Sequence, residues 1–467
     1  MTLPADIQLN AWTGDEVARA TTMDDAARWG AGTRGIPRSQ AVLPFGPPAD
    51  PRDWRSADVG YGVLLPDGTD PNPSDAAKAA GEDAAAPVRE LLAARPDTVV
   101  LRWSPDLPDH LLRRYFADGP PQEPAIGLSE FGIGRGRLPK YVSIVGGPEV
   151  IPWSVQYALG TRHLVGRIPL SGEPLARYVH ALLANWSDAR ARTDRALTWT
   201  VDHGPTDITA LMRAVIAAPL AERLTPPPLA QFRDLRAAEA TGAALLGALT
   251  EISPGLLATS SHGRTGPLGN PAEMRATLGL PVDDTHTTVP LGTLCDAMPG
   301  GCVWYAQACC SAGAAGESFY AGLLPVGSSA FGAVEAVAGL GTMVAPAALE
   351  LLGRENPVRA VLGHVEPTFN WTLQVDDTGQ GLGGRLVSAL STHLYAGEPL
   401  GLALAEYRSD VGELHTRWAR LREALAGGDT SVRETLTRLR VSALDRQSLV
   451  LLGDPTVALP ALGRAGP

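Results

Sequence analysis

Two short apolar runs in this sequence end at residues that could carry out nucleophilic catalysis. The run 256–261 is followed by His262, and the run 303–308 is followed by the adjacent pair Cys309 and Cys310. Each run has the length and composition of a buried strand. A thiol attacks a carbonyl group only as a thiolate, and a neighbouring imidazole can accept its proton. The pattern therefore predicts a cysteine nucleophile and a histidine base.

The residues after these runs fit the same chemistry. Gly263 would let the backbone approach a substrate closely, so that its N–H could stabilise an oxyanion together with the N–H of the nucleophile. Successive residues of a strand face opposite sides, so only one of Cys309 and Cys310 can face His262. The alternative interpretation is a strand-end histidine and two cysteines that serve only core packing.

The rest of the chain predicts an α/β fold that would position these residues. Strands and helices alternate, which is typical of a mostly parallel sheet with helices on both faces. Ligand sites in such sheets lie at the carboxyl ends of the strands, where His262 and the cysteine pair fall. The expected strands cover residues 98–103, 141–152, 164–169, 196–201, 255–260, 302–308, 324–332 and 448–459. The expected helices cover residues 173–188, 207–222, 235–249, 316–323, 341–353, 397–426 and 430–446.

Composition divides the chain into three parts. Residues 1–88 are rich in Pro, Gly, Asp and Ala, with turn signals such as Pro47-Pro48, and predict an irregular region held on the body by scattered tryptophans. Residues 89–195 predict a smaller α/β subdomain, and residues 196–467 predict the catalytic domain. The two charged helices expected near the end of the chain would present a solvated face.

Charge and cysteine usage exclude several classes of function. A formal net charge of −11 over 467 residues argues against nucleic acid as the main partner. The apolar runs are too short to span a bilayer, and the sequence starts without a secretion signal, so we expect a cytoplasmic protein. The four cysteines lie between residues 295 and 310, which does not resemble a disulfide framework. Cys302 and Cys309 would be about 23 Å apart along a strand, so we expect no metal site.

These motifs resemble those of a known group of enzymes. Ser260-Ser261-His262-Gly263 and the run 307–313, Gln-Ala-Cys-Cys-Ser-Ala-Gly, resemble the His-Gly and Ala-Cys-x-x-Gly signatures of the caspase-like (clan CD) cysteine peptidases. Three further segments, residues 141–152, 165–169 and 452–456, resemble the gingipain family within that group. The resemblance implies a caspase-like three-layer sandwich, hydrolysis of peptide bonds and no cofactor.

The same resemblance implies roles for single residues. Asp202 would orient the imidazole of His262, and Asp207 would bind an Arg or Lys side chain of the substrate at the floor of a pocket. Asp207 also fits a helix N-cap, which alone would explain an aspartate there. The Cys-x-x-Gly spacing fits Cys310, whereas the Gln-Ala-Cys sequence fits Cys309, and of the two we expect Cys310 to be the nucleophile.

The sequence also departs from the gingipain pattern. Gingipains are secreted, and the 47 positions from His262 to Cys309 imply an insertion around residues 266–288, which could act as a lid, an activation loop or a partner-binding element. We therefore expect a bacterial cysteine endopeptidase that cleaves protein or peptide substrates after Arg or Lys and is controlled by a regulatory partner, a cleavage or a signal. The alternative is an inactive caspase-like scaffold or regulatory module. A serine hydrolase is disfavoured because the sequence lacks a Gly-x-Ser-x-Gly elbow.

Overall fold

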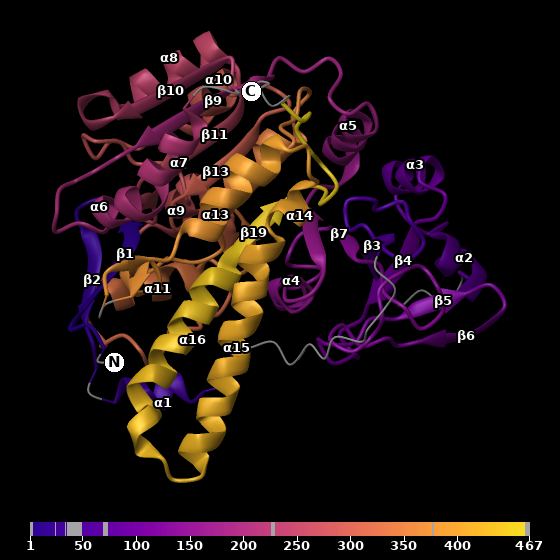
Figure 1. Ribbon diagram of the computed structural model, residues 1–467, viewed down its shortest axis with the longest axis horizontal. Helices are drawn as coiled ribbons and strands as arrows, with labels where there is room; N and C mark the ends of the chain where they lie inside the picture. Colours follow the sequence, from indigo (N-terminus) through magenta and orange to yellow (C-terminus); the bar gives the residue numbers. More distant parts are fainter. Residues whose placement is uncertain are drawn as a thin grey trace, which may run out of the picture.

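The computed structural model describes residues 3–23, 25–32, 34, 49–68, 73–225, 229–375 and 378–462. A ten-stranded sheet runs through the whole molecule (Figure 1). In sheet order its strands are β10 (Gln231–Arg236), β9 (Arg192–Thr200), β11 (Pro254–Ser260), β13 (Val303–Gln307), β16 (Ala360–His364), β19 (Leu449–Leu452), β8 (Leu164–Ile168), β7 (Tyr141–Val145), β3 (Tyr61–Pro66) and β4 (Val99–Trp103). The predicted α/β class with a large, mostly parallel sheet is confirmed.

The sheet consists of two halves that run in opposite directions. All neighbouring strands pair in parallel except β16 and β19, which pair antiparallel. The strands β9, β11 and β13 therefore end on one side of the molecule, and the strands β8, β7, β3 and β4 end on the opposite side. Gly146-Gly147, which follows β7, is thus on the side opposite to His262, which follows β11.

Helices cover both faces of the sheet. One layer contains α3 (Ala86–Ala94), α5 (Gly172–Leu183), α12 (Pro346–Gly353), α10 (Leu291–Ala297) and α8 (Gly242–Ile252), each in contact with the next. The other contains α6 (Ile208–Met212), α7 (Ala218–Leu224), α13 (Gly384–Ser388), α15 (Ala405–Ala426), α16 (Arg433–Ser448) and α4 (Trp153–Gly160). The result is the three-layer arrangement that alternating strands and helices predict.

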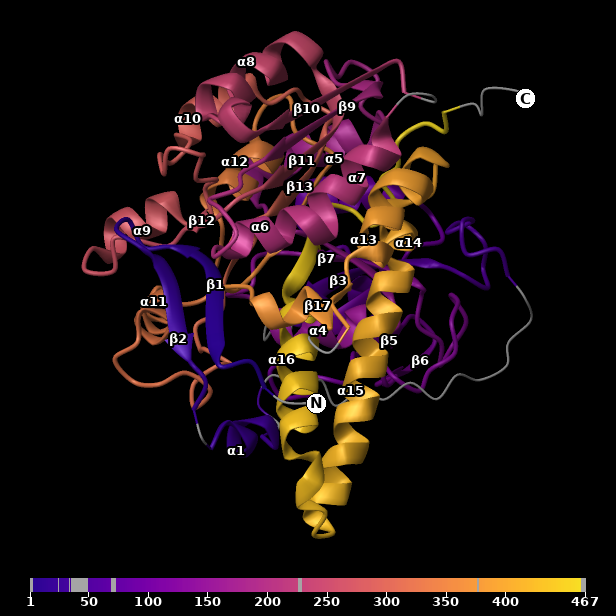
Figure 2. The ribbon, with the colours of Figure 1, turned by 60° about the vertical axis from the view of Figure 1, so that its left-hand side comes forward.

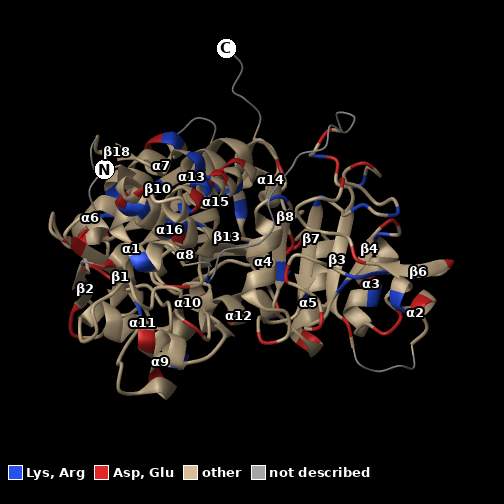
Figure 3. Cartoon of the chain, turned by 90° about the horizontal axis from the view of Figure 1, so that it is seen from below, with Lys and Arg blue, Asp and Glu red and all other residues tan. Residues whose placement is uncertain are grey.

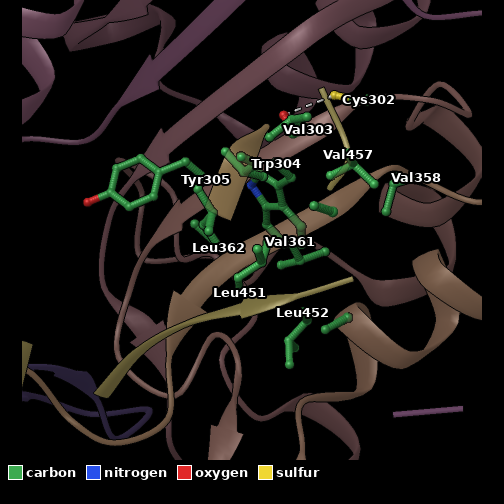
Figure 4. Packing of buried hydrophobic residues seen from close by; sticks show 14 of the residues in the cluster. Cys302, Val303, Trp304, Tyr305, Val358, Val361, Leu362, Leu451, Leu452 and Val457 are labelled. Atoms are coloured by element: carbon green, nitrogen blue, oxygen red, sulfur yellow. Dashed lines mark hydrogen bonds between the residues drawn. The ribbon is translucent and has the colours of Figure 1, made fainter. Parts of the chain in front are cut away.

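Strand β13, which leads to the cysteine pair, is fixed in the centre of the core. Val303, Trp304 and Tyr305 pack among apolar residues of β16 and β19 (Figure 4). The Trp304 Nε1–H donates to the Thr259 hydroxyl of the neighbouring strand at 3.0 Å. The thiol of Cys302 donates to the Val303 carbonyl, and burial raises its pKa to about 12. Cys302 is therefore a packed core thiol that stays protonated and does not act as a nucleophile.

The N-terminal 88 residues are not irregular as expected. They contain β1 (Asp6–Trp12), β2 (Val17–Thr21), α1 (Ala26–Gly30), β3 and α2 (Asp75–Ala80). Strand β3 lies between β7 and β4 in the large sheet. Its run of apolar residues is buried on both faces, as is typical of a strand inside a parallel sheet. The Pro47-Pro48 turn lies outside the described residues.

Three local predictions were wrong. Residues 235–249 form the end of β10 and the helix α8, because the charged sequence of β10 fits an edge strand that the apolar pattern did not reveal. Residues 316–323 form turns, and residues 329–339 form helix α11 (Ser329–Gly339) instead of a strand over 324–332. Ser328 starts this helix by accepting the Phe331 N–H. Strand β16, which the sequence analysis missed, lies in the middle of the sheet.

The last two long helices pack side by side and project from the body (Figures 1 and 2). Most of α16 is buried, which corrects the expectation of a solvated charged helix. Acidic and basic residues are interspersed over the molecule in the view of Figure 3, and some arginines, such as Arg440 of α16, lie inside it. Within the described parts of the chain, no helix is both long and apolar enough to cross a membrane.

Candidate active site

The expected catalytic residues meet at the carboxyl ends of neighbouring strands. Ser260 of β11 lies opposite Gln307 of β13, so His262 and Cys309 each follow two residues after a matched pair. The backbones approach so closely here that a Cβ atom on Gly263 would lie 2.1 Å from the Cys309 carbonyl oxygen. Glycine is therefore required after the histidine, and the structure brings together the two strand ends that the sequence pattern paired.

Asp207 is the carboxylate that contacts His262. The His262 Nε2 atom lies 3.0 Å from Oδ1 and 3.1 Å from Oδ2 of Asp207. Asp207 also caps helix α6, where it accepts the Thr209 N–H at 2.9 Å and the Thr209 hydroxyl at 2.6 Å. Burial alone would raise the pKa of Asp207, but the hydrogen bonds from His262 and Thr209 hold it well below its usual range. The carboxylate is therefore ionised beside the imidazole.

The roles expected for the two aspartates need correction. Asp202 does not contact the imidazole, because it forms an ion pair with Arg213 at 2.9 Å and accepts the Gly204 N–H at 2.9 Å. Asp207, expected at the floor of a pocket for Arg or Lys, is instead engaged with His262. The predicted preference for a basic side chain therefore loses the carboxylate on which it was based. The N-cap interpretation of Asp207 is confirmed.

The two cysteines have different surroundings. The Cys309 thiol donates to the carbonyl oxygen of Gly263 at 3.4 Å, so its sulfur lies beside the residue that follows the histidine. Cys310 has a left-handed backbone with φ of +55°. Burial, followed by contact with Cys309 and the charge of Glu366, raises the pKa of the Cys310 thiol well above its ordinary value. The contact with Gly263 favours Cys309 over Cys310 as the thiol that lies beside the histidine strand.

Two further histidines extend the site, and the sequence analysis missed both. The His203 ring stacks on His262 with centroids 5.6 Å apart and on His286 at 4.0 Å, and Trp12 lies against His286 at 4.3 Å. Burial, with the neighbouring His286 and His262, lowers the pKa of His203, so this ring favours its neutral form. His203 directly follows Asp202, and His286 lies in the insertion expected around residues 266–288, but no pattern in the sequence indicated that these rings would stack at the site.

The site is closed to solvent in this structure. The side chains of His262, Cys309 and Cys310 have no exposed surface. The Nδ1 atom of His262 is buried without a hydrogen-bond partner among the described residues. Within the same part of the chain, no cluster of three or more His, Cys, Asp and Glu side chains could hold a metal ion. What the arrangement offers chemically is an oriented imidazole with one free nitrogen and a thiol on the next strand.

Glu366 is a buried acid close to Cys310, whose N–H donates to the Glu366 carbonyl at 3.3 Å. Burial raises the pKa of the Glu366 carboxyl to about 8. The folded-state pKa of Glu366 is thus above its unfolded value. The free energy of unfolding therefore has its full value, as far as Glu366 is concerned, below about pH 4.5, and part of it is lost as the pH rises through 8.

This linkage predicts the behaviour of Glu366→Gln. We expect the variant to have a higher Tm than the wild type at pH 8 and a smaller or reversed difference at pH 5, because glutamine keeps the neutral shape without ionising. Thermal unfolding followed by circular dichroism at both pH values measures the effect. An equal change in Tm at both values would contradict a neutral buried carboxyl.

Comparisons with known proteins give structural neighbours only. No protein family and no curated protein matches the sequence. A solved structure described as a protease has a TM-score of 0.46 and 10% identity, over 86% of this chain and 79% of that chain. The Arg-specific cysteine proteinase gingipain R has a TM-score of 0.38 and 12% identity, over 87% and 79% of the two chains. A complex of the pro- and mature domains of RgpB from Porphyromonas gingivalis has a TM-score of 0.38 and 12% identity, over 86% and 80%. Gingipains are thus among the structures that this chain resembles. The role of each residue is inferred from the contacts that the residue makes in this protein.

Proposed function

We propose that this protein is a caspase-like cysteine endopeptidase that uses Cys309, His262 and Asp207. The observation that carries the proposal is the Asp207–His262 hydrogen bond at the end of β11, next to the end of β13. Asp207 engages Nε2 and leaves Nδ1 of the same ring without a partner among the described residues. Nδ1 is then the nitrogen that accepts the thiol proton.

The reaction follows from these positions. The Cys309 thiol exchanges its present acceptor, the Gly263 carbonyl, for His262 Nδ1 and transfers its proton. The thiolate attacks the carbonyl carbon of the scissile bond, and the N–H groups of Gly263 and Cys309 stabilise the oxyanion. His262 returns the proton to the leaving amine as the C–N bond breaks. Water then hydrolyses the thioester and regenerates the thiol.

Asp207 has two effects on this cycle. It fixes the ring orientation, and its negative charge stabilises the imidazolium that forms after proton transfer. Helix α6 holds the carboxylate in place through the cap to Thr209, so that little reorganisation is needed during the reaction. Asp202 pairs with Arg213 in a partly exposed ion pair and takes no part in this cycle.

The substrate class in this proposal is a protein or peptide, and the chemistry needs no cofactor. A preference for Arg or Lys remains a prediction without a carboxylate to support it. Regulation by a partner, a cleavage or a signal remains part of the proposal, and the closed site supports it because a substrate has no access to Cys309 in this state.

A peptide library tests the proposed activity. The test uses the Gln8→Pro protein, in which the strand that covers the site is weakened. We expect a library of proteome-derived peptides to show new termini after incubation with this protein, and no new termini when the protein also carries His262→Ala. Mass spectrometry identifies the termini. New termini that persist at the same level in the His262→Ala protein would rule out the proposed mechanism.

A further inference from the structure

Strand β1 lies directly on the residues that follow the histidine. The strands β1 and β2 form an antiparallel hairpin, and β1 pairs in parallel with β12 (Gly263–Arg264) (Figure 2). In this pairing Ala11 lies opposite Gly263, and Trp12 lies opposite Arg264. The hairpin thus adds strands to an edge that would otherwise offer its backbone groups to an incoming peptide.

The edge of β1 that faces β12 also contacts the segment after Glu366, and the opposite edge pairs with β2. The Asn10 N–H donates to the Thr368 carbonyl at 3.0 Å, and Leu9 forms an antiparallel bridge with Phe369. The Gln8 N–H donates to the Asn370 side chain at 3.3 Å. One edge of β1 is therefore bound along its length by residues next to the site, as an extended peptide substrate would be, while β2 holds its other edge.

The alternation of β1 directs its polar residues toward Asp207 and His262. Ile7, Leu9 and Ala11 pack in the same apolar cluster as Cys309 and Cys310. The residues between them face the other side. Gln8 donates from Nε2 to the Thr206 carbonyl at 3.0 Å, next to Asp207, and Trp12 lies against His286.

Asn10 lies between these two contacts and therefore faces the Asp207–His262 pair. It has no exposed surface, and neither its amide nitrogen nor its amide oxygen has a hydrogen-bond partner among the described residues. A buried polar side chain without a partner destabilises the fold, so its presence here suggests a functional role.

The register places the Asn10 carbonyl where a scissile carbonyl would lie. The Thr265 N–H donates to the Trp12 carbonyl at 3.0 Å. A parallel ladder repeats every two residues, so the same pattern sets the Asn10 carbonyl opposite the Gly263 N–H. Gly263 is the residue whose N–H would stabilise the oxyanion, and Asn10–Ala11 then corresponds to the bond that would be cleaved.

We infer that β1 occupies the substrate cleft of the peptidase as an attached pseudosubstrate, with Asn10 in the pocket for the residue before the scissile bond. The inference rests on the proposed function and extends it in two ways. The N-terminal hairpin keeps the site closed, and the pocket that holds the buried Asn10 selects an uncharged amide side chain instead of Arg or Lys. The attachment gives β1 a high effective concentration, so a free peptide competes poorly until the hairpin leaves.

The test opens the cleft in the full chain by one substitution in β1. In Gln8→Pro, proline removes the N–H that contacts Asn370 and disfavours strand pairing. The control is Asp15→Ala, at the exposed turn of the same hairpin. Each protein is treated with peptidyl acyloxymethyl ketones that carry Asn or Arg before the reactive group, and separately with the small reagent chloroacetamide. Rates of modification at Cys309 are followed by mass spectrometry.

We expect Gln8→Pro to be labelled by the Asn probe at least about tenfold faster than the wild type and Asp15→Ala. In the opened protein, the Asn probe should react at least about tenfold faster than the Arg probe. A peptide of residues 5–14 added to Gln8→Pro should slow this labelling, and the same peptide with Asn10→Arg should slow it less. Trp12→Ala, which loses the contact with His286, serves as a milder opening if Gln8→Pro does not fold.

Three outcomes would overturn parts of this account in distinguishable ways. Equal labelling of the wild type and both opening variants would show that β1 does not close the cleft. Faster reaction of the Arg probe than of the Asn probe would show that the pocket does not select the side chain of Asn10. Faster alkylation of Cys309 by chloroacetamide in Gln8→Pro, without reaction of either peptidyl probe, would keep β1 as a cover and overturn the peptidase function.

Discussion

Cys309→Ala in the Gln8→Pro protein is expected to lower kcat/KM for a peptide substrate by about 10⁴-fold or more, because the nucleophile is lost. Cleavage of a fluorogenic peptide with Asn before the scissile bond measures the effect. The expectation rests on the position of the Cys309 sulfur, 3.4 Å from the Gly263 carbonyl at the end of the histidine strand.

Cys310→Ala in the same protein is the matched control. We expect its kcat/KM to stay within about tenfold, with a modest loss of stability from the missing buried sulfur, about 1 kcal/mol. The adjacent thiols are equally buried, so the comparison isolates their chemistry from their packing. An inactive Cys310→Ala protein beside an active Cys309→Ala protein would reverse the assignment.

Asp207→Asn is expected to lower kcat by about 10² to 10⁴-fold with little change in KM. Asparagine can still cap helix α6, so the fold should persist, but it neither stabilises the imidazolium nor enforces the same ring orientation. Steady-state kinetics at constant pH, with circular dichroism as a check on folding, measures the change.

The control for the carboxylate is Asp202→Asn, which breaks a partly exposed ion pair with Arg213. An exposed pair contributes little, about 0 to 1 kcal/mol, so kcat should change by less than about threefold. A large loss of kcat in Asp202→Asn together with a normal Asp207→Asn protein would restore the roles that the sequence motifs suggest.

The strand ends of the site could be predicted from the sequence, because strand order and direction follow from simple rules. Apolar runs that end at His262 and Cys309 lie beside each other in a parallel sheet, and the structure has them on neighbouring strands. The choice between Asp202 and Asp207 depends on the path of a short turn. Its direction is set by local contacts such as the Asp202–Arg213 pair, and strand periodicity says nothing about them.

The role of the first strand was harder to predict for a different reason. The alternation of Ile7, Leu9 and Ala11 with polar residues does signal a strand. It is short, however, and its partner β12 consists of two residues 252 positions away. Such a pairing is visible only once the sheet is assembled. Helix α11 was mistaken for a strand because short apolar, Ala-rich runs fit both periodicities.

The central claim is that Cys309 and His262 form a peptidase site, and identification of the covalently modified residue tests it most directly. The opened Gln8→Pro protein is treated with the Asn acyloxymethyl ketone, digested and analysed by tandem mass spectrometry. The account predicts a thioether adduct on Cys309 that is lost when His262→Ala is added, with Cys302 and Cys310 unmodified. An adduct on Cys310 would contradict the choice of nucleophile, and the absence of any adduct on a folded, opened protein would contradict the peptidase function and favour a non-catalytic scaffold.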